Sequence, residues 1–171
     1  MLTLPVKTRR KKQPYLSIRS RLSRRNIPRQ AVVFYAELRD HMASRGIEDW
    51  GPAFMRYLVI GQDGELDMEF GYFTSRPHSG GGPVRSDFMP AGTFVTTQWT
   101  GPYDKLTDVN AMLSGWVAGN GSNWHMRPTD AGIAYGCRME IFHLSIRHVA
   151  DPAQYRTEIA ILLEPPGARA A

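Results

Sequence analysis

Hydrophobic and polar residues alternate in period two over several short stretches of this 171-residue chain. Such alternation is typical of β-strands, because successive side chains point to opposite faces of a sheet. It predicts strands at residues 15–22, 54–60, 65–73, 94–99, 136–146 and 156–163. The sequence Gly61-Gln62-Asp63-Gly64 between the second and third of these strands predicts a tight hairpin turn.

Two other stretches follow the helical period. The first runs from Asn26 to about Arg45, with Pro28 suited to a first turn and Gly46 suited to an end. The second follows the turn at Gly101 and runs to about residue 117. The residues expected to face inward are Val32, Tyr35, Ala36, Leu38 and Met42 in the first helix, and Leu106, Val109, Leu113 and Trp116 in the second.

The predicted elements occur in the order β-α-β-β, a Gly- and Pro-rich loop at 75–83, and β-α-β-β again. Duplicated units of this kind join into one antiparallel sheet. We therefore expect an α+β fold with two long helices packed on one side of the sheet and a ligand pocket between the halves. Residues 15–164 are expected to form this domain, between a disordered basic tail at 1–14 and a disordered C-terminal tail at 165–171.

The net charge of +5 is unevenly distributed along the chain. Residues 1–29 hold ten Lys or Arg and no acid, whereas residues 30–171 hold eleven basic and sixteen acidic residues. A nucleic-acid-binding domain carries its positive charge on the fold itself. The basic run at 7–12 is therefore interpreted as a solvated tail, and direct sequence-specific DNA binding is not expected.

The remaining chemistry excludes several classes of protein. The apolar runs are too short to cross a bilayer, so we expect a cytoplasmic protein with no membrane contact. Cys137 is the single cysteine, and the five histidines form no metal-spaced pair, so neither a metal nor a cofactor is expected. The run Gly80-Gly81-Gly82 lacks the Lys of a phosphate-binding loop.

One carboxylate interrupts an apolar strand face. In the strand at 136–146, Glu140 shares its face with Phe142, Leu144 and Ile146. Burying a carboxylate costs several kcal/mol unless it is paired or protonated, so Glu140 marks a candidate ligand site. The alternative is that Glu140 lies at the rim, where water or Arg138 compensates its charge.

Several short motifs occur together in a fairly specific order and spacing. They are Met89-Pro90-Ala91-Gly92, Gly101-Pro102-Tyr103, Met139-Glu140-Ile141-Phe142, Asp151-Pro152 followed by Thr157-Glu158-Ile159, and Gly51-Pro52-Ala53-Phe54. Together they resemble the GyrI-like, or bacterial effector-binding, domain family over about residues 14–164. This family occurs alone and as the C-terminal half of multidrug-sensing transcription regulators. Phe142 stands where the family often has Tyr, so one hydroxyl group is absent.

The resemblance implies a duplicated βαββ fold with a shared central pocket for cationic, aromatic or amphipathic molecules. It places Glu140 at the floor of this pocket, against the positive charge of a ligand. The aromatic residues considered for its walls are Tyr57, Phe73, Trp99, Trp124 and Phe142. Taken singly, each aromatic is also explained by core packing. Trp124 is favoured because it lies in a polar connector, where a large apolar side chain needs cover.

Three functions remain open from the sequence. The favoured one is a stand-alone small-molecule binding protein, which senses or sequesters hydrophobic cationic or aromatic compounds and regulates transcription, if at all, through a protein partner. The second is a small-molecule hydrolase that uses Glu140 as acid or base, with Tyr57 or Tyr103 supplying a hydroxyl group. The third is a protein-interaction module, as in gyrase-inhibiting relatives, which the acidic body of the chain favours.

Overall fold

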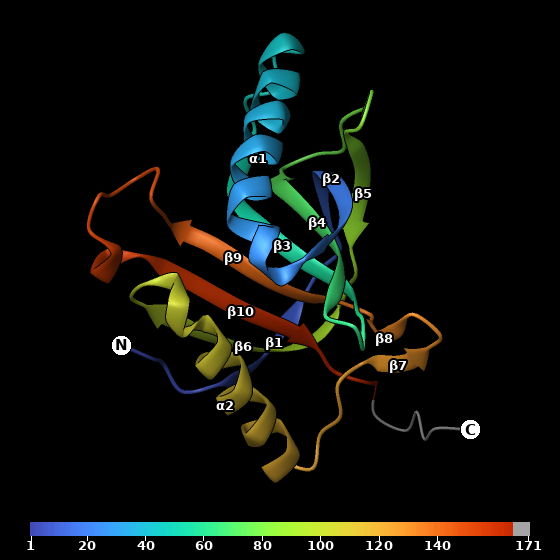
Figure 1. The fold of residues 1–171 in the computed structure, drawn as a ribbon, viewed down its shortest axis with the longest axis vertical. Coiled ribbons are helices and arrows are strands. Elements are labelled where there is room, and N and C mark those ends of the chain that lie inside the picture. Colours follow the sequence, from blue (N-terminus) through green and yellow to red (C-terminus); the bar gives the residue numbers. More distant parts are fainter. Residues whose placement is uncertain (166–171) are drawn as a thin grey trace.

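The structure is a computed structural model that describes residues 1–165 (Figure 1). This part of the chain contains two long helices, α1 (Ile27–Ser44) and α2 (Leu106–Gly119). Its ten strands are β1 (Val6–Arg10), β2 (Gln13–Ser23), β3 (Trp50–Ile60), β4 (Glu65–Thr74), β5 (Arg85–Met89), β6 (Gly92–Thr100), β7 (Met126–Thr129), β8 (Gly132–Tyr135), β9 (Arg138–Leu144) and β10 (Arg156–Leu162).

The described strands form one antiparallel sheet in the order β1-β6-β10-β9-β3-β4-β2-β5. The hairpin of β7 and β8 joins it through β8, which pairs with β3. Both helices lie on the same side of the sheet, with β9 and β10 running between them (Figure 1). The expected α+β fold is confirmed.

The sheet order displays the duplication. In the first unit, β2-α1-β3-β4, strand β4 lies between β2 and β3. In the second unit, β6-α2-β9-β10, strand β10 likewise lies between β6 and β9. The two units meet where β3 pairs with β9, at residues 53–56 and 139–142.

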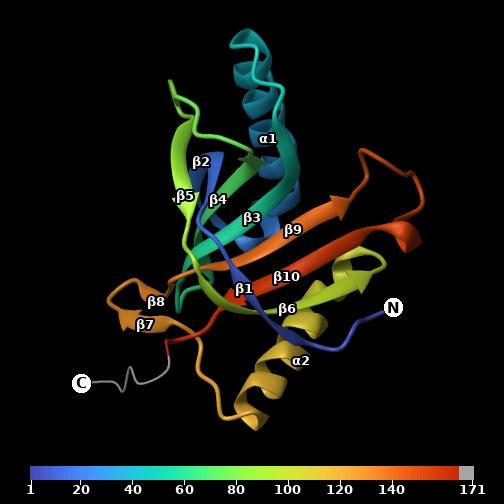
Figure 2. The same ribbon diagram turned by 180° about the vertical axis from the view of Figure 1, so that it is seen from behind.

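One further strand precedes each unit in the sequence and pairs with the other unit. Strand β1 precedes the first unit but pairs with β6 of the second, and β5 precedes the second unit but pairs with β2 of the first. The two-residue link at 11–12 joins β1 to β2, and the link at 90–91 joins β5 to β6. Each link therefore connects strands near opposite ends of the sheet order. The sheet curls to bring these ends together, as the view from behind shows (Figure 2).

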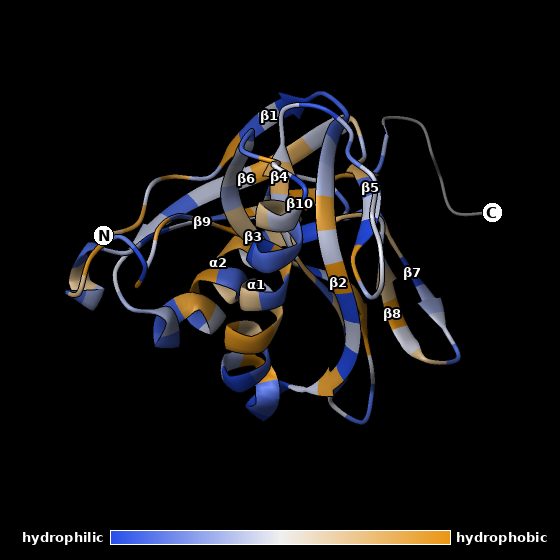
Figure 3. Cartoon of the chain, turned by 90° about the horizontal axis from the view of Figure 1, so that it is seen from above, coloured by the Kyte–Doolittle hydropathy of each residue, from blue (hydrophilic) through white to orange (hydrophobic). Residues whose placement is uncertain are grey.

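The N-terminal segment corrects one expectation. We expected residues 1–14 to form a disordered tail, but Val6–Arg10 form β1 and β2 begins at Gln13. The residues of β1 are mostly hydrophilic (Figure 3), so the strand lacks apolar alternation and is stabilised by its backbone pairing with β6. Within the expected C-terminal tail, residues 166–171 lie outside the described part of the chain.

Apolar side chains cover both faces of the sheet. On the helix side, α1 buries Leu38 and Met42, and α2 buries Leu113. The expected inward stripe of α1 is wrong at Val32, which is 72% exposed. On the opposite face, a second cluster fills the inside of the curl and contains Tyr15, Phe54, Phe73, Met89, Phe94, Cys137, Met139, Ile141, Ala160 and Leu162.

Two strand regions went beyond the sequence patterns. The hairpin of β7 and β8 lies between α2 and β9, and β5 follows the expected Gly- and Pro-rich loop. Across residues 1–165, neither helix combines the length and apolar character that a bilayer crossing requires.

Candidate functional site

Glu140 lies at the junction of the two units. It belongs to β9, where it is opposite Met55 of β3 on one side and Ile159 of β10 on the other. Met55 packs with the cluster beneath α1, and Ile159 packs with the cluster beneath α2. Glu140 therefore faces the helix side of the sheet, between the two helices. The residue is only 7% exposed, so the alternative of a solvated rim position is not what the structure shows.

The Glu140 carboxylate has few partners for a buried charge. Its Oε1 accepts a hydrogen bond of 3.3 Å from the Asn110 side-chain amide of α2. It forms no ion pair with any residue in the described chain. Burial raises the pKa of Glu140, while the charge of Arg138, the Asn110 amide and the nearby Tyr57 hydroxyl group lower it, and burial prevails.

Aromatic side chains surround this carboxylate. Tyr57 of β3 and Phe142 of β9 are 7% and 8% exposed, and both lie on the same sheet face as Glu140. Burial and the charge of Glu140 raise the pKa of Tyr57, which keeps its hydroxyl group protonated as a donor. Beyond Phe142, the ring of Tyr103 makes an edge contact at 5.5 Å and stacks on Tyr155 at 4.8 Å.

Two polar residues complete this site: Arg138, which the sequence offered only as a compensating charge for Glu140, and Asn110, which was missed. Arg138 donates to the Asn110 amide oxygen at 3.0 Å and to the Tyr135 hydroxyl at 3.1 Å, and its guanidinium lies 5.6 Å from the ring centre of Tyr57. Asn110 therefore connects Arg138 to Glu140. A signal for Asn110 existed, because it lies four residues after Leu106 and so shares the inner face of α2.

Three other predicted residues lie outside this group. Trp99 packs against the α2 cluster, and its indole N–H donates to the Pro102 carbonyl at 2.9 Å. A Cβ at Gly101, where φ is +146°, would come within 2.6 Å of the Trp99 ring. Gly101 of the Gly101-Pro102-Tyr103 motif therefore allows Trp99 to pack closely against the backbone. Trp124 packs against the same cluster. Phe73 lies on the opposite face of the sheet, with Met139.

A second buried glutamate offers a contrast. Glu69 of β4 is 6% exposed on the face opposite the helices. Its carboxylate accepts hydrogen bonds from Tyr15 at 3.0 Å, Ser17 at 3.3 Å and Arg56 at 3.2 Å. Arg56 also forms an ion pair with it. Glu69 is thus fully compensated by the protein, whereas Glu140 is not. Within residues 1–165, no cluster of His, Cys, Asp and Glu is arranged to hold a metal ion.

Comparisons with known proteins identify the fold. No family model matches the sequence, and a search of curated proteins finds no significant match. Solved structures do match. The C-terminal domain of EcmrR superposes with a TM-score of 0.67 at 19% identity, over 94% of this chain and 97% of that domain. A structure of EcmrR in complex with DNA also matches, and there the chain covers 57% of the longer protein.

Two further structures have the same fold. SAV2435, solved with bound tetraphenylphosphonium, matches with a TM-score of 0.60 at 8% identity, over 95% of this chain and 94% of that one. A hydrolase from Listeria innocua matches with a TM-score of 0.59 at 13% identity, over 94% and 91%. The chain therefore has the fold of GyrI-like effector-binding domains, as its motifs predicted.

Proposed function

We propose that this protein binds hydrophobic cations and that Glu140 is the counter-ion for the ligand. The observation that carries this proposal is the incomplete compensation of Glu140. The carboxylate is buried, receives one neutral amide hydrogen bond of 3.3 Å, and forms no ion pair in the described chain. A cationic ligand supplies the missing charge, and the low polarity of the surroundings strengthens that interaction.

The neighbours of Glu140 suit a delocalised cation. Tyr57 and Phe142 offer aromatic rings, which attract organic cations through their electron-rich faces. Glu140 also lies at the junction of two structural units, where ligand sites often form. The fold is shared with SAV2435, a protein solved with the cation tetraphenylphosphonium, and with the C-terminal domain of EcmrR. By analogy, the bound compound acts as an effector that is sensed or sequestered.

Arg138 does not take the place of such a ligand. Its guanidinium donates to neutral partners, the amide oxygen of Asn110 and the hydroxyl of Tyr135. It is held 5.6 Å from the Tyr57 ring centre and 5.1 Å from the Tyr135 ring centre. Its charge lowers the pKa of Glu140 and so favours the ionised carboxylate that a cationic ligand requires.

A titration with tetraphenylphosphonium tests the proposal, with triphenylphosphine oxide as a neutral aromatic control. Glu140→Gln keeps the shape and the Asn110 hydrogen bond but removes the charge. We expect it to weaken phosphonium binding by about 2–5 kcal/mol, the range for breaking a desolvated charge pair, and to weaken the neutral compound much less. Glu37→Gln is the matched control, because Glu37 is exposed on α1. Isothermal calorimetry measures the affinities of the parent and both variants for the two compounds.

Two outcomes would reject the cation site. One is an equal loss for the charged and neutral compounds in Glu140→Gln, which would leave the carboxylate without an electrostatic role. The other is a loss of the same size in Glu37→Gln, which would reflect net charge alone. If the parent protein binds no phosphonium at all, the binding of hydrophobic cations is itself refuted.

A specific observation also favours a hydrolase as the second candidate. Burial raises the pKa of Glu140, and the protonated Tyr57 hydroxyl lies beside it, as a general acid–base pair requires. The fold is also that of the Listeria innocua hydrolase. Incubation with a strained electrophile such as styrene oxide distinguishes the two functions. If the parent consumes styrene oxide and Glu140→Gln does not, the result supports the hydrolase. If neither protein consumes it, the result favours binding without hydrolysis.

A further inference from the structure

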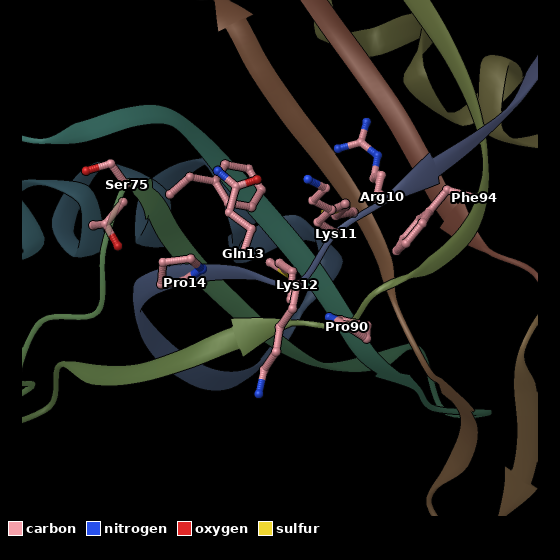
Figure 4. A pocket seen from close by; sticks show the side chains of 12 residues that line it. Arg10, Lys11, Lys12, Gln13, Pro14, Ser75, Pro90 and Phe94 are labelled. Atoms are coloured by element: carbon pink, nitrogen blue, oxygen red, sulfur yellow. The ribbon is translucent and has the colours of Figure 1, made fainter.

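A cavity lies on the face of the sheet opposite Glu140. Its volume is about 320 Å³, and it lies where the two short links cross between the units (Figure 4). The first link and its flanks contribute Arg10, Lys11 and Lys12, and the second contributes Pro90. The volume is at the lower end of the range for small-molecule sites, which corresponds to a compound of one or two rings.

Several residues that line this cavity are apolar. Pro14 and Pro90 are partly exposed, whereas Phe73, Phe94, Met89 and Met139 are 4%, 0%, 3% and 1% exposed. The rings of Phe73 and Phe54 pack at 4.8 Å, which fixes the position of this wall. Pro14 and Pro90 therefore provide accessible apolar surface for the body of a ligand.

The outer part of the cavity is positively charged. Arg10, Lys11 and Lys12 are three cations, and none of the residues that line the cavity is acidic. Arg10 forms an ion pair with Glu158 on its far side, so its charge is partly compensated. The Lys12 ammonium lies 4.2 Å from the ring centre of Phe88 and forms no ion pair in the described chain. The excess of positive charge attracts anions.

Two polar atoms at the cavity lack partners within the described chain. Thr74 lines it and is 2% exposed, yet its hydroxyl group is buried without a hydrogen bond. The Nε atom of Arg10 is also buried and unpartnered. Buried polar groups in proteins almost always find a partner. Both atoms donate hydrogen bonds, and an anionic oxygen accepts them.

We propose that this cavity binds a small amphipathic organic anion, a carboxylate on an aromatic or other apolar body. The apolar body packs on Pro14 and Pro90, in front of the buried Phe73, and the carboxylate lies toward Thr74 and the basic link. Glu140 and this cavity then form two sites of opposite charge preference on opposite faces of one sheet. Nucleic acid fits less well, because phosphates gain nothing from a wall of Phe and Met side chains.

The probe for this site is 2-naphthoate, with its neutral isostere 2-naphthamide as the control compound. The double variant Lys11→Gln/Lys12→Gln removes two charges at the cavity. Lys7→Gln/Arg9→Gln removes two exposed charges from the same basic segment, at positions that do not line it. We expect the first variant to weaken naphthoate binding about threefold to tenfold and the second to change it less than twofold.

Thr74→Val gives an independent measurement, because valine has the shape of threonine without the hydroxyl group. We expect it to weaken naphthoate binding about tenfold and to leave the melting temperature unchanged or slightly raised, since an unpartnered buried polar group is removed. Glu140→Gln is expected to leave naphthoate binding unchanged. The two proposed sites can therefore be confirmed or refuted independently of each other.

Three results would overturn the anion site. Equal losses in the two double variants would assign the effect to net charge. Equal affinities of the parent for naphthoate and naphthamide would remove the role of the carboxylate. If Lys11→Gln/Lys12→Gln weakens retention of a short DNA duplex but not naphthoate binding, the lysines contact phosphates instead.

Discussion

Replacing Glu140 by glutamine is expected to stabilise the protein in the absence of ligand. The carboxylate is 7% exposed, and one hydrogen bond from Asn110 is all that the described side chains donate within 3.5 Å. Removing an ion from water costs several kcal/mol, of which this hydrogen bond and the charge of Arg138 return a part. We expect a gain of about 1–3 kcal/mol in the free energy of unfolding at pH 8. For a protein of this size, each kcal/mol raises the melting temperature by about 2–4 °C.

The gain depends on pH in a direction set by the raised pKa of Glu140. The folded protein holds the Glu140 proton more tightly than the unfolded chain does. The parent therefore gains stability as the pH falls from the raised pKa toward the unfolded value of about 4.3, and loses it as the pH rises. Glu140→Gln has no such proton, so its advantage is expected to be largest at pH 8 and to vanish near pH 4.

Urea unfolding at several pH values measures this difference. Glu69→Gln is the matched control, because Glu69 is equally buried but forms an ion pair with Arg56. It is expected to lower the stability by about 3–5 kcal/mol, since the Arg56 charge is then left buried without a partner. A Glu140→Gln variant less stable than the parent at pH 8 would refute the reasoning. So would an advantage of the same size at pH 4 and pH 8.

Two further predictions concern the packing of the sheet. Gly71→Ala is expected to lower the free energy of unfolding by about 1–3 kcal/mol, because a Cβ there comes within 2.6 Å of the Leu16 carbonyl oxygen. Gly115→Ala is the control, because a Cβ at this position of α2 meets open space, and it is expected to raise the free energy of unfolding by about 0.5–1 kcal/mol. If urea unfolding shows the same change in stability for both variants, the close contact at Gly71 is contradicted. Deleting residues 1–10 removes β1 from the sheet and is expected to cost about 2–4 kcal/mol. An unchanged urea midpoint would restore the interpretation of this segment as a tail.

The helix side of the sheet was accessible from the sequence, whereas the opposite face was not. In β4, alternation correctly separated Met68 and Phe70 from Asp67 and Glu69. Alternation does not show that Glu69 is buried with Arg56, which happens because the sheet curls over this face. Such a curl depends on contacts between distant segments, and local periodicity contains no information about them.

The candidate site was predicted in part. Glu140, Tyr57 and Phe142 come together because alternation and strand order place them on one face. Phe73 does not join them. It lies four residues after Glu69 in β4, so period two already assigned both to the same face. Asn110 was missed because a polar residue on a helix is normally read as solvent-facing.

The basic strand β1 was missed for a different reason. Its charged side chains form no apolar pattern, and its pairing partner β6 is remote in the sequence. The duplication relates it to a second strand that was also missed: β5 precedes the second unit as β1 precedes the first.

The exchange of β1 also has a consequence for the synthesis of the chain. Strand β1 leaves the ribosome about 90 residues before the strand with which it pairs. At about 5–20 residues per second, it waits about 5–20 s with both edges open. Open strand edges promote aggregation, and closely spaced Lys and Arg side chains oppose it by repulsion. The positive charges at 7–12 are therefore expected to oppose aggregation of the exchanged strand while its partner is being made.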